Sequence, residues 1–228
     1  METSGPFVAR VAVGNIDRSP RYAGSVATTE DGTRPYHHGN LRAALLRRAE
    51  EVLAESGVDG LSLRGIARDV GVSHAAPRRH FADRQALLDA LAQDGFERLG
   101  EQMRAAAAEP AGDFVERLTA VATAYVSFAT QHAALLELMF AGKHRPGASE
   151  ELYAAAERAF ATPFELVAEG QRSGDVVDGD QQQLATATWS TIHGLATLIG
   201  AGLLDRSTLP TLVAEVVERA VLGLRPRG

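Results

Sequence analysis

The chain has 228 residues, enough for one large domain or two modest ones, and its hydrophobic content of 45% excludes disorder throughout. It contains no cysteine, which excludes disulfides, thiol catalysis and cysteine-ligated metal sites, and its aromatic content of only 6% favours helices over sheets. The formal net charge of -6 is uneven, because residues 34–84 hold nine Lys and Arg against six Asp and Glu, whereas residues 85–228 hold eleven against nineteen.

The first part of the chain lacks helical periodicity. Residues 1–37 mix Gly, Ser, Thr and Pro with isolated charges, which predicts a flexible arm; a basic arm that enters the minor groove of DNA is the sharper alternative. From residue 39 the pattern changes. Apolar residues recur at spacings of three and four, which predicts an amphipathic helix that ends at Gly57; they are Leu41, Leu45, Ala49, Val52 and Leu53.

Two short helices and a long one are predicted next. Ser62 is a plausible N-cap for a helix whose buried stripe ends at Val70, and Gly71 supplies a tight turn. Ser73 is expected to cap a third helix that runs to Phe81. Asp83 is expected to cap a fourth helix that continues to about residue 107 and stops before Pro110.

The pattern after residue 110 remains helical. Asp113 and Glu116 have the spacing of a capping box, and helices are expected over about 132–141 and 149–161. Thr162-Pro163-Phe-Glu165 resembles a second capping box, so the chain should kink or restart there. Asp180 should open a helix to about residue 204, and Pro210 lies near the start of the last one. With no sustained strand alternation after residue 39, the predicted fold is all-α.

Residues 61–81 carry the clearest functional signal. Two short helices joined by a glycine turn and supported by a preceding helix form a helix-turn-helix, whose second helix can enter the major groove. The predicted recognition helix, 73–81, has small residues at Ala75 and Ala76 that allow close approach to DNA. The local excess of positive charge fits a segment that meets phosphates.

The order of these features resembles the N-terminal domain of the tetracycline-repressor (TetR) family. The resemblance covers about residues 38–98 and rests on His38-Gly-Asn-Leu, on Leu61-Ser-Leu-Arg-Gly-Ile-Ala-Arg-Asp-Val-Gly-Val-Ser and on His80-Phe81. It implies DNA contacts by nine residues: Ser62, Arg64, Ser73, His74, Ala75, Ala76, Arg78, His80 and Arg84. His74, Ala75 and Ala76 would face base edges, and Arg84 would grip a phosphate. Arg78 departs from the family, which usually has tyrosine there.

The resemblance also implies a C-terminal dimerisation and effector domain. Trp189 and His193 lie four residues apart on one helix face and precede Gly194, as in a TetR subgroup with a Trp-…-His-Gly element. Core packing or an effector pocket would both explain this pair. The candidate pocket residues are Met103, Tyr125, Phe128, Met139, Phe164, Trp189 and His193. The last two helices suit a two-fold bundle between subunits.

The expected organisation is an arm over 1–37, a DNA-binding domain over 38–98 and an effector and dimerisation domain over 99–228. We expect a cytoplasmic homodimer that binds a near-palindromic operator in double-stranded DNA and an unidentified small-molecule effector. No membrane, metal, cofactor or enzymatic activity is expected, since the sequence shows no phosphate-cradling loop, metal cluster or long apolar run. The alternative is a helical ligand-binding or adaptor protein that has lost DNA binding.

Overall fold

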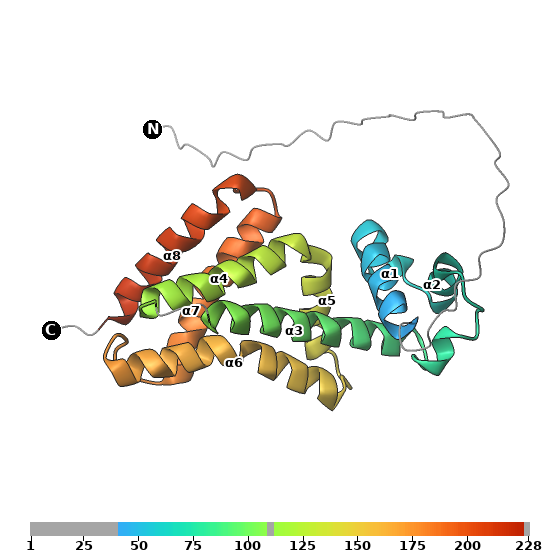
Figure 1. Cartoon of the computed structure of the whole chain (residues 1–228), viewed down its shortest axis with the longest axis horizontal. Coiled ribbons are helices and arrows are strands. Elements are labelled where there is room, and N and C mark those ends of the chain that lie inside the picture. Colours follow the sequence, from blue (N-terminus) through green and yellow to red (C-terminus); the bar gives the residue numbers. More distant parts are fainter. Residues whose placement is uncertain (1–40, 109–111, 226–228) are drawn as a thin grey trace, which may run out of the picture. The chain divides into compact units, whose positions relative to one another are not determined.

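The computed structural model describes residues 41–108 and 112–225, and within them the chain forms α-helices and short 3-10 helices and no strand (Figure 1). The prediction of an all-α fold is therefore confirmed. The predicted arm lies outside the described residues. The elements are α1 (Leu41–Ser56), η1 (Val58–Gly60), α2 (Leu63–Val70), η2 (Pro77–Arg79), α3 (Arg84–Ala108), α4 (Phe114–Gln131), α5 (Ala133–His144), α6 (Glu150–Ser173), α7 (Gln181–Gly200), η3 (Arg206–Thr208) and α8 (Leu209–Leu224).

The elements from α1 to the first turns of α3 form a small unit that we call the head. Its apolar side chains pack into one cluster, in which Leu45, Leu61, Ile66 and Phe81 are each at most 2% exposed. The predicted stripe of α1 is thus the buried face of the first helix. Because these residues come from four separate segments, the cluster fixes the angle at which the short helices meet.

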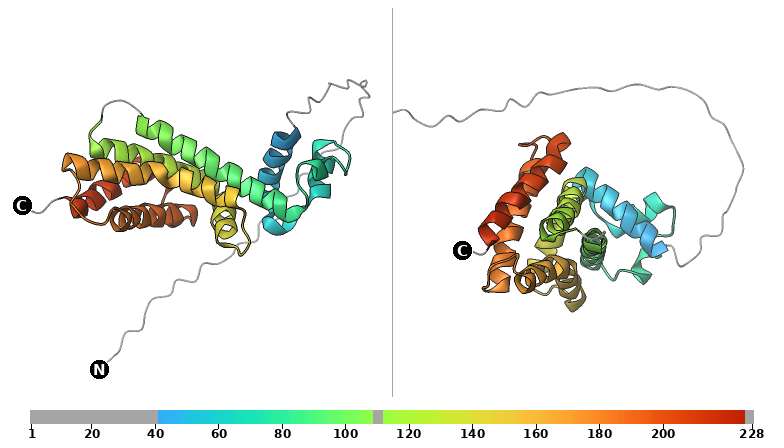
Figure 2. Two further views of the ribbon diagram at one scale, coloured as in Figure 1. Left: turned by 90° about the horizontal axis from the view of Figure 1, so that it is seen from below. Right: turned by 60° about the vertical axis from the view of Figure 1, so that its left-hand side comes forward.

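The long helix α3 connects the head to the remaining helices, α4 to α8, which we call the body. Asp83 caps its start as predicted, since the backbone N–H of Ala86 donates to Asp83 Oδ1 over 2.8 Å. Further along, α3 and α6 lie side by side (Figure 2). Gly100 makes this approach possible, because a Cβ there would lie 2.8 Å from the Cα of Ala159 in α6.

The body confirms some predicted boundaries and corrects others. Asp113 and Glu116 form the predicted capping box at the start of α4. Of the two outcomes predicted at Thr162-Pro163, a kink or a restart, the restart is wrong, because α6 runs from residue 150 to 173 with Pro163 inside it. Pro163 removes one backbone hydrogen bond of the helix but leaves the hydrogen bonds on either side of it. The buried face of α6 continues on both sides of Pro163. The helix that begins after Asp180 ends at Gly200, four residues earlier than expected.

Among the described helices, none combines the length and the apolar character needed to cross a membrane.

Candidate functional site

The first helix of the predicted pair begins and ends as the sequence indicates. The Oγ atom of Ser62 accepts a hydrogen bond from the backbone N–H of Gly65 over 3.1 Å, so Ser62 is a true N-cap. Gly71 closes α2 with φ of +76°, a left-handed conformation that side chains bearing a Cβ adopt only with strain. Open space surrounds Gly71, so the backbone conformation, and not crowding, requires glycine at this turn.

The predicted recognition helix over 73–81 is not an α-helix. It consists of a turn followed by η2, with i→i+3 hydrogen bonds from Ala76 N to the Ser73 carbonyl and from His80 N to the Pro77 carbonyl, both 2.9 Å. Pro77 has no N–H. It therefore cannot donate the hydrogen bond to the Ser73 carbonyl that an α-helix would require at this position. The predicted cap is also wrong in kind, because Ser73 contributes its carbonyl and not its side chain to this turn.

This segment nevertheless keeps two faces. Pro77 and Phe81 are buried in the head. The side chains predicted to meet DNA are mostly exposed, with Ala76 half-buried; the exposed ones are Ser73, His74, Ala75, Arg78 and His80. Arg79 is also exposed and was not predicted, since sequence spacing in a presumed α-helix does not reveal which side of a 3-10 turn faces solvent.

An open polar groove of about 540 Å³ separates α1 from α2 and gathers part of the predicted site. Ser62, Arg64 and His74 line it together, although eleven residues of sequence separate the first from the last of these. The other predicted DNA contacts do not line this groove. The structure thus brings the start of α2 and the start of the 73–81 segment to one surface.

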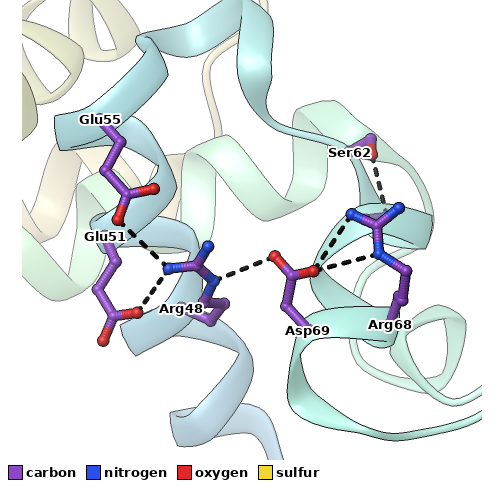
Figure 3. Close-up of polar contacts among 7 residues, drawn as sticks. Arg48, Glu51, Glu55, Ser62, Arg68 and Asp69 are labelled. Atoms are coloured by element: carbon purple, nitrogen blue, oxygen red, sulfur yellow. Dashed lines mark hydrogen bonds and ion pairs between the residues drawn. The ribbon is translucent and has the colours of Figure 1, made fainter. Parts of the chain in front are cut away.

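An ion-pair network whose members Arg48, Arg68 and Asp69 also line this groove holds α2 against α1 (Figure 3). Arg48 of α1 donates to Glu51 Oε2 over 2.8 Å and to Asp69 Oδ2 over 3.1 Å, and lies 3.6 Å from Glu55. Asp69 of α2 also accepts from Arg68. The Arg48 hydrogen bond holds the pKa of Asp69 below its usual range, and Arg68 lowers it further. The network was not predicted, because Arg48 and Asp69 are distant in sequence.

Arg84 has a role that the sequence did not indicate. Its Nε donates to the Leu61 carbonyl over 2.9 Å and its Nη2 to the Val58 carbonyl over 2.6 Å. The guanidinium therefore ties the start of α3 to the loop that precedes α2. A phosphate contact, the predicted role, would have to use the N–H groups that remain.

A partly open pocket of about 30 Å³, which we call the internal cavity, lies between α3, α4, α6 and α7 of the body. Its lining is almost wholly apolar: Met103, Leu118, Val121, Ala122, Tyr125, Phe160, Pro163, Val167, Ala185, Thr188, Trp189 and Ile192. Three of the predicted pocket residues are in this set. Of the others, Phe164 lines a separate outer groove and Met139 packs against Gly95 of α3. The ring of Phe128 lies against that of His132, with centroids 4.8 Å apart and an interplanar angle of 41°.

The Trp189–His193 pair lies beside the cavity as a stacked pair. The two rings are 4.9 Å apart with an interplanar angle of 19°, which confirms that they share one face of α7. The Tyr125 hydroxyl of α4 and Nδ1 of His193 share a hydrogen bond of 2.6 Å. Burial lowers the pKa of His193 and raises the pKa of Tyr125, so both groups are uncharged at neutral pH.

A polar junction between head and body was also missed. Glu50 of α1 accepts from Arg98 of α3, with Oε2 3.0 Å from Nη1, and lies 2.8 Å from Nδ1 of His132 at the start of α5. Arg98 also covers the ring of Phe128, 5.9 Å away. The carboxylate of Glu50 therefore joins α1 to α3 and to the start of α5. Within 41–108 and 112–225, no three His, Asp or Glu side chains converge in a way that could hold a metal ion.

Two family models match the chain. The model for bacterial regulatory proteins of the tetR family matches residues 45–91, which are the head, and the model for the tetracyclin repressor-like C-terminal domain matches residues 118–224 of the body. The tetracycline repressor protein class C of Escherichia coli is 44% identical over 52 residues, covering 23% of this chain and 24% of that protein.

Longer similarities exist as well. An HTH-type transcriptional regulator of Mycobacterium tuberculosis is 27% identical over 154 residues, and the match covers 65% of each chain, slightly less than two thirds of that relative's length. A solved protein of unknown function from Rhodococcus sp. RHA1 is 46% identical, covers 85% of this chain and 100% of its own, and superposes with a TM-score of 0.78. A TetR family transcription regulator from Marinobacter aquaeolei shares the fold at 19% identity, with a TM-score of 0.67 over 82% of this chain and 96% of its own.

Proposed function

This chain belongs to the tetracycline repressor (TetR) family of bacterial regulatory proteins, and on that premise we propose that it is a sequence-specific DNA-binding repressor that a small-molecule effector releases from its operator. The observation that carries the proposal is the groove of the head, where Ser62, Arg64 and His74 meet on one exposed polar surface. The position of this surface within the family's DNA-binding segment, 45–91, supports a contact with double-stranded DNA. We place the domain boundary near residue 98, within α3.

DNA binding is testable on the upstream region of the chain's own gene. Replacing Arg78 with Ala should weaken binding to every sequence and reduce the slope of log K against log salt by about one, because a phosphate contact is lost. Replacing His74 with Ala should instead cost about 1–3 kcal/mol on the preferred sequence and relax the preference at one position. Fluorescence anisotropy with operator and scrambled duplexes over a salt series measures both effects.

The unaltered chain provides the reference for this experiment, and Ala54→Ser, an exposed change on α1, is a matched neutral variant. If Arg78→Ala and His74→Ala weaken all sequences equally, the proposed division between phosphate and base contacts is wrong. The absence of an α-helix over 73–81, together with Arg78, favours a second candidate function, a ligand-binding protein without DNA affinity. Undetectable binding to every duplex at low salt would support that second function.

We propose that the second copy in the homodimer binds to α7 and α8. The helix α7 contains no Lys, Arg, Asp or Glu, although much of one face is exposed. Large apolar side chains protrude from the two helices and the loop between them, with Leu198 44%, Leu203 72% and Leu222 59% exposed. An uncharged face with protruding leucines is typical of a surface that is buried against another copy.

Placing a charge on this face should break the dimer. Ala187→Arg on α7 should weaken association by about 3–5 kcal/mol, because each arginine would be buried without a partner at the interface. Ala105→Arg places the same charge on an exposed position of α3 and should leave association unchanged. Sedimentation velocity over a range of concentrations distinguishes the two. A dimer that survives Ala187→Arg unchanged would place the interface elsewhere.

The contacts of Glu50 supply a route from effector to operator. The α4–α5 junction, at His132, touches the head through Glu50, and α4 also lines the internal cavity. An effector that displaces α4 would therefore shift a residue that holds α1. In a dimer such a shift changes the separation of the two heads and with it the fit to two half-sites.

A further inference from the structure

Two hollows in the body share a wall of two aromatic side chains. The internal cavity, of about 30 Å³, is large enough for one or two water molecules only. An outer groove of about 450 Å³ lies between α5, α6 and α7. Phe160 and Trp189 line both, and their rings meet edge to face with centroids 5.8 Å apart. Rotation of these two side chains would join the hollows into one site.

The wall contains one hydrogen-bond donor that the fold leaves unused. The indole N–H of Trp189 is buried and donates to no acceptor among the described residues. It approaches the Tyr125 oxygen, where it offsets part of the rise in the pKa of Tyr125, but it does not reach hydrogen-bonding geometry. A buried donor without an acceptor is unfavourable, so a ligand that supplies the acceptor gains affinity from it.

The internal cavity offers no counter-charge to the part of a ligand that enters it. Its lining, as far as the structure describes it, includes no Lys, Arg, Asp or Glu, and its polar groups are Tyr125, Thr188 and Trp189. The neighbouring His193 shares a hydrogen bond with Tyr125 and is neutral. An ionised carboxylate or amine would lose its hydration here without gaining a counter-charge.

We propose that this site binds an uncharged aromatic effector with a carbonyl or ether oxygen that accepts the Trp189 N–H, and that Phe160 and Trp189 open to admit it. The ring of the ligand stacks among the aromatic side chains of α4, α6 and α7, and the oxygen points to Trp189. The outer groove, with Lys143, His144 and Glu157, forms the entrance. This inference rests on the proposed effector-regulated function and specifies the class of its ligand.

Three probes of nearly equal shape test the proposal on the full-length protein without DNA. Acetophenone carries the acceptor, ethylbenzene replaces its carbonyl by methylene, and benzoate replaces its methyl by a charged oxygen. We expect acetophenone to bind about fivefold more tightly than ethylbenzene and about fiftyfold more tightly than benzoate. Calorimetry gives the affinities, and the emission of Trp189, the one tryptophan of the chain, should change on binding.

The variant Trp189→Phe separates the hydrogen bond from the shape of the site. It keeps an aromatic ring but removes the donor, so acetophenone should fall to the affinity of ethylbenzene, while ethylbenzene binding is retained and shows that the site is still folded. Equal affinity for benzoate and acetophenone, an unchanged preference in Trp189→Phe, or failure of all three probes to bind would each overturn the proposal. Operator binding by the ligand-free protein is measured separately. It shows whether the proposed DNA-binding function holds even when the proposed ligand class is wrong.

Discussion

Phe81→Ala is expected to lower the free energy of unfolding by about 3–5 kcal/mol and to abolish operator binding. Phe81 is 2% exposed and packs in the cluster that joins Leu45, Leu61 and Ile66. Its backbone also closes η2, through a hydrogen bond of 2.9 Å from its N–H to the Pro77 carbonyl. Loss of the ring would therefore release the whole 73–81 segment from the head. Urea unfolding followed by circular dichroism, with anisotropy for DNA binding, measures both effects.

The matched variant is Val58→Ala, which shortens another apolar side chain of the head. Val58 is 37% exposed, so its truncation should change stability by less than about 1 kcal/mol and leave operator affinity intact. A Phe81→Ala protein that unfolds like the original but fails to bind DNA would mean that Phe81 acts at the DNA surface and not as an anchor.

Gly100→Val is expected to lower the free energy of unfolding by about 2–3 kcal/mol. The first added carbon would lie 2.8 Å from the Cα of Ala159, and a backbone atom cannot move aside as a flexible side chain can. The helices α3 and α6 must then separate, which also alters the internal cavity, since Met103 on α3 and Phe160 on α6 both line it. Thermal and urea unfolding measure the loss, and the acetophenone affinity should fall in parallel.

Ala105→Val on the same helix separates crowding from helix propensity. Position 105 is exposed, so Ala105→Val should lower the free energy of unfolding only through the weaker helix propensity of valine, by roughly 0.5 kcal/mol. If the two variants lose the same stability, the close approach of α3 and α6 does not explain the need for glycine at position 100.

The sequence was most informative where structure depends on nearby residues. The caps at Ser62, Asp83 and Asp113 and the turn at Gly71 were predicted because each uses hydrogen bonds or a backbone conformation confined to a few residues. The repeat of Leu41, Leu45, Ala49 and Leu53 likewise identified the face of α1 that is buried except at its first residue, which is half-buried.

Predictions from local sequence were wrong where two local preferences competed, or where a residue distant in sequence determines the contact. Pro163 predicted a kink or a restart, and the restart does not occur, because tertiary packing holds α6 in one helix. Residues 73–81 were expected to form an α-helix, but Pro77 lacks an N–H to donate, and the segment forms a turn and a 3-10 helix instead. The true partners of Arg84, the carbonyls of Val58 and Leu61, lie more than twenty residues away, so a resemblance to DNA-contacting positions could not reveal them.

Part of the candidate cavity was foreseeable and part was not. Tyr125 and Trp189 stood out by residue type, whereas Phe160 belongs to a stretch whose sequence reads as ordinary core. Its importance comes from its place between two hollows, which depends on how α6 crosses α7. Residue type can indicate that an aromatic side chain lines a pocket, but only the packing of the helices shows which side chain separates the two hollows.

The carboxylate of Glu50 bears on how new regulators could be assembled from related chains. A head taken from one protein and joined to the body of another would fold around its own apolar cluster. Without an acidic residue at position 50, however, His132 would lose its carboxylate partner and Arg98 would keep only Asp94 of α3. Such a hybrid would lose the ion pairs that join α1 to α3 and to the start of α5. An acidic residue at position 50 should therefore be one requirement for exchanging heads and bodies with signalling intact.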